Sequence, residues 1–140
     1  MTEENKLDNA YSETTNGVTV NIQPVYLEHQ SDPSIGEYFW EYHVRIENHR
    51  DTVAQLLTRH WRIVDARGQA HDVIGDGVVG EKPILKPGDA FEYTSGTPLS
   101  TSSGFMSGSF RMISEGGEQF DVTVPAFSLD SNEKRRSELH

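Results

Sequence analysis

The chain has 140 residues, no cysteine and a formal net charge of −10. A chain of this length forms one domain that buries about two-thirds of its unfolded surface, and the lack of cysteine excludes disulfides and thiolate chemistry. Residues 17–129 carry −7 of the charge, because the first sixteen residues carry −3 and the last eleven balance to zero. Since an acidic domain repels nucleic acid and anionic lipid, we expect neither nucleic acid nor membrane as a partner.

The two ends of the chain are more polar than its middle. We therefore predict a disordered acidic N-terminal tail at residues 1–16, a folded domain at 17–129 and a disordered polar C-terminal tail at 130–140. No apolar run approaches the roughly 18 residues of a membrane span, and the acidic N-terminus differs from a signal peptide. We expect a cytoplasmic protein, either a monomer or a weak homodimer.

The first predicted strands are recognised by alternation of apolar and polar residues. Val18, Val20 and Ile22 alternate with polar residues, which is typical of a half-buried strand. The apolar parity changes after Pro24, and this predicts a bulge or a change of sheet. The clearest strand lies at 40–47, where large apolar residues face one way and charged residues the other.

A third strand is predicted at 56–64, and it contains one conflict. Strict alternation places Arg59 on the same side as Trp61, which we expect in the core. An unpaired charge there would cost several kcal/mol. We therefore expect a bulge, or an Arg59 near the end of the sheet that is held in an ion pair, with contact to a ligand as the alternative.

The rest of the chain repeats short strands and turns. Strands are predicted at 70–74, 91–95, 105–113 and 120–124, whereas the composition of residues 95–109 is typical of a loop. Pro125 again precedes a change of parity, which an edge strand tolerates. Seven to eight antiparallel strands, with turn signals every eight to twelve residues and no helical periodicity, predict an all-β, immunoglobulin-like β-sandwich.

The segment Gly75-Asp76-Gly77-Val78-Val79-Gly80 fits the pattern G-x-G-x-x-G. A dinucleotide-binding unit needs a helix directly after it, but Pro83 and Pro87 exclude one. A kinase loop needs further motifs that the sequence lacks, and the acidic surroundings disfavour phosphate. Glycines that allow a tight turn or bulge are the favoured interpretation.

Catalytic and metal-binding patterns are weak. The six histidines are scattered, and no hydrolase elbow or zinc-protease motif is present. His71 and Asp72, near Asp76, could form a weak divalent-cation site, but neighbours on a strand point to opposite faces. We therefore expect no enzyme activity, no cofactor and no bound metal.

Many residues between positions 59 and 108 together resemble the ApaG (CorD) family. They include Arg59-His60-Trp61-Arg62-Ile63, Val73-Ile74-Gly75-Asp76-Gly77-Val78-Val79-Gly80, Leu85-Lys86-Pro87-Gly88, Ser95-Gly96, Gly104, Met106 and Gly108. The resemblance implies a fibronectin type III-like sandwich, a link to cobalt tolerance and magnesium efflux, and partner binding, since similar domains occur in F-box proteins. It carries over no catalytic residues.

The leading hypothesis is a non-enzymatic binding module for an unidentified protein partner. The binding loop would be Gly75, Asp76, Gly77, Val78, Val79 and Gly80, with Arg59 and Trp61 in support and with residues 95–108 nearby. The alternative is a small-ligand binder for nucleotide, pyrophosphate or a divalent cation at the same loop. An enzyme acting on phosphate esters is the third hypothesis.

Overall fold

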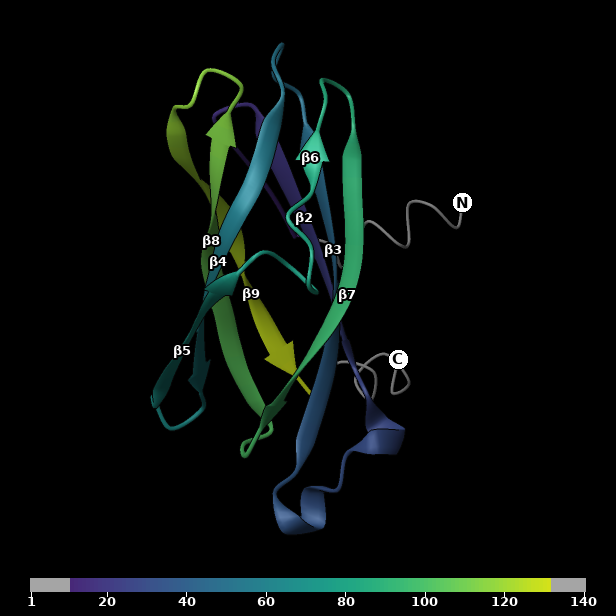
Figure 1. Ribbon diagram of the computed structural model, residues 1–140. Helices are drawn as coiled ribbons and strands as arrows, with labels where there is room; N and C mark the ends of the chain where they lie inside the picture. Colours follow the sequence, from purple (N-terminus) through teal and green to yellow (C-terminus); the bar gives the residue numbers. More distant parts are fainter. Residues whose placement is uncertain (1–10, 132–140) are drawn as a thin grey trace.

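A computed structural model describes residues 11–131 and shows strands throughout this part of the chain (Figure 1). The strands are β1 Tyr11–Thr15, β2 Val18–Tyr26, β3 Tyr38–Asn48, β4 Ala54–Asp65, β5 Ala70–Asp76, β6 Ile84–Leu85, β7 Ala90–Leu99, β8 Ser103–Ser114 and β9 Gln119–Asp130. Two single-turn 3-10 helices, η1 Glu28–Gln30 and η2 Pro33–Ile35, join β2 to β3. Neither helix is long enough to cross a membrane, nor is any other helix within residues 11–131.

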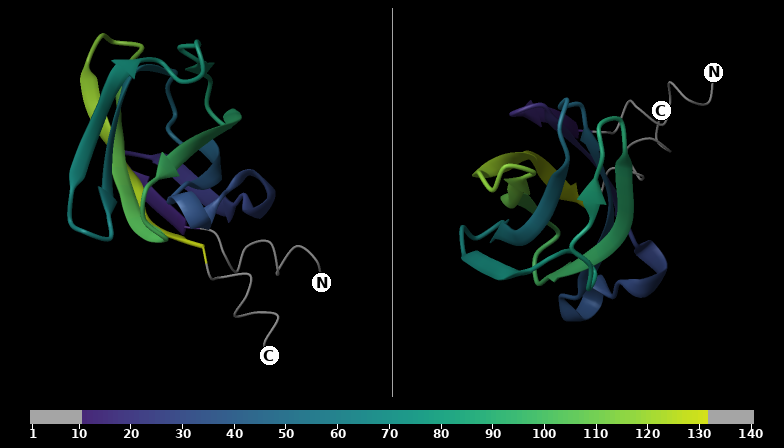
Figure 2. Two further views of the ribbon diagram at one scale, coloured as in Figure 1. Left: turned by 90° about the horizontal axis from the view of Figure 1, so that it is seen from below. Right: turned by 45° about the horizontal axis from the view of Figure 1, so that its top comes forward.

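The strands form two antiparallel sheets that face each other as layers (Figure 2). The first sheet has the order β1-β2-β3-β7, and the second has the order β5-β4-β8-β9 with the short β6 also paired to β4. The predicted all-β sandwich is therefore confirmed. Because the strands are pleated, successive side chains point to opposite faces of a sheet. One face of each sheet therefore lies between the two layers, where the apolar side chains meet.

Trp61 lies in the centre of this core and is 3% exposed. Its ring contacts Phe110 and Phe127 edge-on, at centroid distances of 6.0 and 6.3 Å. It also packs against Tyr42 of the opposite sheet at 5.3 Å. Trp61 therefore joins the two layers, and Trp40 of β3, which is 1% exposed, extends the same core.

The two sides of the sandwich differ. On one side β1 and β2 pack against β9, with the Tyr11 ring 6.0 Å from Phe127 and the Thr123 amide donating to the Thr15 hydroxyl at 3.2 Å. On the other side the edges are β5 and β7, and among the described residues no strand pairs with their outer edges. The sandwich is thus closed along β1 and β9 and open between β5 and β7.

Strand β1 corrects the predicted N-terminal tail. Tyr11–Thr15 pairs with Val18–Ile22 of β2 and is not a disordered segment. The turn between them is Asn16-Gly17, with φ of 51° and 79°. Positive φ at both central residues makes Asn-Gly the strongest short hairpin signal, and the alternation rule alone missed it. Residues 1–10 and 132–140 of the two predicted tails lie outside the described residues.

The loop expected at residues 95–109 is also corrected. Strand β7 continues to Leu99 and β8 begins at Ser103, so only a tight turn separates them. The small residues serve close packing between strands. A Cβ at Gly108 would lie 2.2 Å from the carbonyl oxygen of His60, which is too close for any other residue.

Both prolines that precede a change of parity lie where a strand lacks a partner on one edge. The bulge or change of sheet predicted at Pro24 is wrong, because β2 keeps one register with β3 from Val18 to Tyr26. Pro24 lies beyond the end of the pairing of β2 with β1, which stops at Ile22, so the missing N–H breaks no ladder bond. Pro125 lies where the register between β8 and β9 shifts, and β9 is an edge strand as predicted.

The central position of Trp61 predicts a large cost of truncation. Trp61→Ala should lower the free energy of unfolding by about 3–5 kcal/mol, because it leaves a cavity between the layers. Phe105→Ala is the control, since Phe105 is a large aromatic residue that is 59% exposed; this variant should lose less than about 1 kcal/mol. Urea denaturation measures both, and equal losses would contradict this placement of the core.

Candidate functional site

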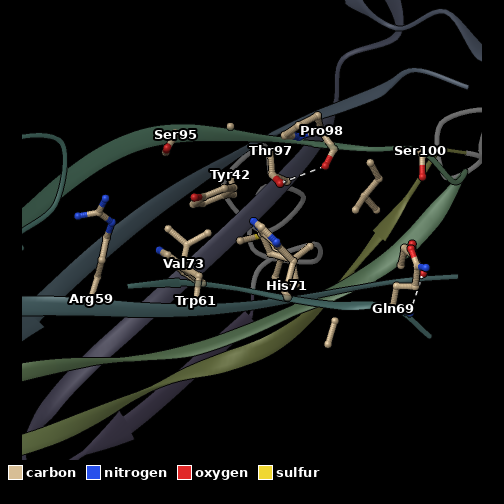
Figure 3. Close-up of a pocket in the computed structure, with 16 residues that line it drawn as sticks. Tyr42, Arg59, Trp61, Gln69, His71, Val73, Ser95, Thr97, Pro98 and Ser100 are labelled. Carbon is tan, nitrogen blue, oxygen red and sulfur yellow. Dashed lines mark hydrogen bonds between the residues drawn. The ribbon is translucent and has the colours of Figure 1, made fainter. Parts of the chain in front are cut away.

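The open side of the sandwich contains a cleft of about 730 Å³ between β5 and β7 (Figure 3). This volume is within the usual range for ligand sites. The cleft is lined by Tyr42, Arg59, Trp61, Ile63, Asp65, Gln69, Ala70, His71, Val73, Ser95, Gly96, Thr97, Pro98, Leu99, Ser100 and Met106. We call it the β5–β7 cleft.

Two aromatic rings from opposite sheets form the floor of the cleft. Tyr42 of β3 and Trp61 of β4 lie together in its middle, below Thr97 of β7 (Figure 3). Burial raises the pKa of the Tyr42 hydroxyl, against the smaller lowering effects of its hydrogen bond with Ser95 and of the nearby Arg59 charge. The two rings give the cleft an apolar middle, and polar groups lie at both ends, of which the end beside Ser95 carries a charge.

Arg59 occupies that end of the cleft (Figure 3). The register of β4 with β8 shifts between Leu56 and Thr58, before Arg59, so the bulge expected to turn Arg59 away from Trp61 is wrong and both residues line the cleft. The expected ion pair is wrong. Arg59 Nη1 instead donates to the backbone carbonyls of Asp76 and Gly77, at 2.9 and 3.0 Å. Among the described residues no carboxylate forms an ion pair with this guanidinium.

The glycine segment forms the end of β5 and the loop that leads to β6, and no helix follows it. Gly75 lies against the Arg59 guanidinium, and a Cβ there would approach Nη1 to 2.9 Å. Gly77 has a φ of 63°, and a Cβ would lie 2.3 Å from the carbonyl oxygen of Glu81. These two glycines therefore allow close approach of other groups to the backbone.

The remaining loop residues form a tight turn. Val78 and Glu81 exchange two backbone hydrogen bonds, of 2.8 and 2.9 Å. Val79 and Gly80 between them have φ of 43° and 80°, as the central residues of a type I′ turn do. Val78 is fully buried, whereas Val79 is 53% exposed. Only Val79 of this pair is available to a partner.

The amides of this loop are largely used within the fold. Gly77 donates its N–H to the carbonyl of Leu57 at 2.8 Å, and the N–H groups of Val78 and Glu81 bond to each other's carbonyls. A phosphate cradle needs amides that point together at the ligand. The geometry therefore favours the interpretation of the motif as a structural turn.

Tyr93 of β7 supplies an unusual buried group near Arg59. The residue is 9% exposed, and its hydroxyl has no hydrogen-bond partner among the described residues. Burial raises its pKa above the ordinary value, Tyr42 adds to this increase, and the Arg59 charge opposes it. The Tyr93 hydroxyl therefore lies within the electrostatic reach of two residues that line the cleft.

The candidate metal ligands His71 and Asp72 are separated by the pleat. His71 lines the cleft, while Asp72 lies on the outer face and accepts from His60 at 3.0 Å and Arg62 at 3.1 Å. The His60 hydrogen bond and, to a lesser extent, the Arg62 charge hold the pKa of Asp72 below its usual value. Within residues 11–131 no group of three potential metal ligands comes together.

Sequence reasoning identified Arg59, Trp61 and the segment 95–108 as parts of the binding surface, but it did not single out the residues that β7 brings to the cleft. Ser95, Thr97 and Ser100 lie in the segment that was expected to be a loop, and Tyr42 was assigned only to the core. A signal was present in Ser95-Gly96-Thr97, a run of small residues that continues the strand predicted at 91–95. Such a run leaves the backbone accessible at an edge.

Strain in the Val79-Gly80 turn generates a prediction. A β-branched residue at positive φ is unfavourable, whereas asparagine tolerates it. Val79→Asn should therefore raise the free energy of unfolding by about 1 kcal/mol, as measured by urea denaturation. Val79→Ile keeps the β-branch and should give no gain. A Val79→Asn variant less stable than the parent would contradict the positive φ at this position.

Comparisons with known proteins agree with this geometry. The family model described as "ApaG domain" matches residues 28–114. Protein ApaG of Rhodospirillum centenum is 56% identical over 121 residues, covering 86% of this chain and 93% of the relative. Protein ApaG of Paramagnetospirillum magneticum is 54% identical over 127 residues, covering 90% and 98%.

A solved structure titled as an ApaA protein, from Bordetella pertussis, superposes with a TM-score of 0.81. It is 43% identical, and the match covers 83% of this chain and 94% of that one. The family model covers more than half of the chain, the relatives match over nearly their whole length, and the solved structure has the same sandwich. The chain belongs to the ApaG domain family.

Proposed function

We propose that this protein is a non-enzymatic binding module that docks a protein partner along the β5–β7 cleft and the adjoining Gly75–Gly80 loop. The observation that carries the proposal is the open cleft of about 730 Å³ with an aromatic floor and a guanidinium that has no carboxylate partner among the described residues. Exposed loops and edges on a rigid sandwich are common places for recognition.

The small-ligand alternative has less support at the glycine loop, because the Gly77, Val78 and Glu81 amides bond within the fold. Catalysis also has little support. A hydrolase needs a nucleophile within hydrogen-bond reach of a base, and in the described part of the chain the His71 ring makes no such bond with Ser95, Thr97 or Ser100. The proposal therefore assigns binding and no reaction.

A photo-crosslinking residue placed at Ser100 tests the proposal. Ser100 is exposed and lines the cleft, while Ser102 is exposed, lies outside it and serves as the matched control. Irradiation of cells that express the full chain with benzoylphenylalanine at Ser100 should give one discrete protein adduct, at least several-fold stronger than with the label at Ser102. Equal labelling at both positions, or none at either, would contradict partner docking in the cleft.

The loop is tested separately with Val79→Asp. Since Val78 is buried, a charge there would damage the core and say nothing about binding. Val79→Asp alters only the exposed position, and it should weaken the Ser100 adduct without loss of folding. Expression, far-UV circular dichroism and adduct yield are compared with those of the parent chain.

Cytoplasmic location, a monomeric or weakly dimeric state, and the link to cobalt tolerance and magnesium efflux stay predictions. The crosslinked partner bears on the last of these. Mass spectrometry that identifies the adduct as a magnesium or cobalt transport protein would support the link, and a partner outside metal transport would count against it.

A further inference from the structure

We infer that the partner is recognised through an extended peptide segment that lies along β7, places a carboxylate against Arg59 and places an apolar side chain on the Tyr42 and Trp61 floor. The inference rests on the proposed function and adds to it the chemistry of the partner. Three features of the cleft support it, namely the open edge of β7, the charge at Arg59 and the apolar floor of Tyr42 and Trp61.

The edge of β7 itself faces the cleft. Six consecutive residues, Ser95 to Ser100, line it. In a strand that presents one face to a pocket only every second residue would do so, so a consecutive run indicates that the backbone edge is presented. Small side chains at Ser95, Gly96 and Thr97 leave this backbone accessible, and a strand of ten residues with an open edge is a template for strand addition.

The length of this run sets the size of the occupant. Five of these residues, Ser95 to Leu99, belong to β7 and span about 14 Å at about 3.4 Å for each step, so the cleft accommodates about four residues of an extended segment along the strand. Arg59 and Ser95 lie at one end, Trp61, His71 and Thr97 in the middle, and Gln69 and Ser100 at the other end (Figure 3). Along the cleft from the Arg59 end to the Ser100 end, the partner therefore contacts a cation, then an aromatic surface, then amide and hydroxyl groups.

Charge complementarity selects a carboxylate for the Arg59 end. The guanidinium bonds through Nη1 to two carbonyls of the loop and forms no ion pair among the described residues. A planar guanidinium binds carboxylates with paired, charge-assisted hydrogen bonds. Because the chain as a whole carries −10, a second copy of it would be repelled, whereas one local cation at an open edge recruits a segment with a matching anion.

A random hexapeptide library with free and with amidated C-termini, selected on the full chain, tests the inference. Enriched peptides should share an acidic residue, or a free C-terminus, next to an apolar residue. For the best peptide, exchange of the carboxylate for its amide (Asp→Asn or C-terminal amidation) should weaken binding to the parent chain by about tenfold to a hundredfold, as loss of a charged hydrogen bond does. Comparison of the libraries with free and with amidated C-termini shows whether the carboxylate belongs to an acidic side chain or to the C-terminus of the peptide.

Variants of the chain test whether the selected peptide binds in the β5–β7 cleft. Ser100→Trp should abolish binding, and Ser102→Trp should leave it unchanged. Arg59→Gln should remove the difference between the acid and amide peptides. Since Arg59 also holds the loop, Arg59→Lys is the second variant; it keeps the positive charge but loses the paired N–H groups, so it should still prefer the acid peptide while binding it several-fold more weakly.

The outcomes separate the inference from the proposed function. Absence of enriched peptides, enrichment without carboxylates, or peptides that bind Ser100→Trp as well as the parent would overturn the inference, while the adduct at Ser100 would still support partner docking. A dimer in sedimentation velocity that Arg59→Gln converts to monomer would make a second copy the occupant, and this would also overturn the inference.

Discussion

The packing of Trp61 between the two sheets is the interaction on which both the fold and the cleft depend. Its edge contacts with Phe110 and Phe127 fix it to its own sheet, while Tyr42 meets it from the other. The same ring also lines the β5–β7 cleft. Because it belongs to the core, the floor of the cleft is as rigid as the sandwich, and little conformational entropy is lost when a ligand settles on it.

The open side is a consequence of how the strands are paired. Strands β1, β2 and β9 close one side, and β5 and β7 each end a sheet on the other. Proteins usually protect long edges with charge, proline or a covering segment, because an open edge invites association. Here β7 has Glu92 and Pro98 near its two ends, and the small residues Ser95, Gly96 and Thr97 between them. An edge protected only near its ends is suited to selective pairing.

Local patterns in the sequence predicted the fold well and the site only in part. Alternation identified seven strands and Trp61 in the core, since side-chain period and burial are local properties. The first strand was missed because its main signal is the Asn16-Gly17 turn, and not alternation. The cleft depends on the pairing of β7 with β3 and of β5 with β4, over long sequence separations. No local pattern predicts which edges then face each other.

The glycine motif shows why a letter pattern without its context misleads. Gly75 makes room for the guanidinium of Arg59, Gly77 for the carbonyl of Glu81, and Gly80 supplies a positive φ to the turn. These are three different physical requirements, and none of them involves an anion. Their common effect is to hold the loop carbonyls of Asp76 and Gly77 where Arg59 can donate to them. Since those bonds orient the guanidinium at the end of the cleft, the role of the motif in the proposed binding site is to position Arg59, and that role does not require its own amides to touch a ligand.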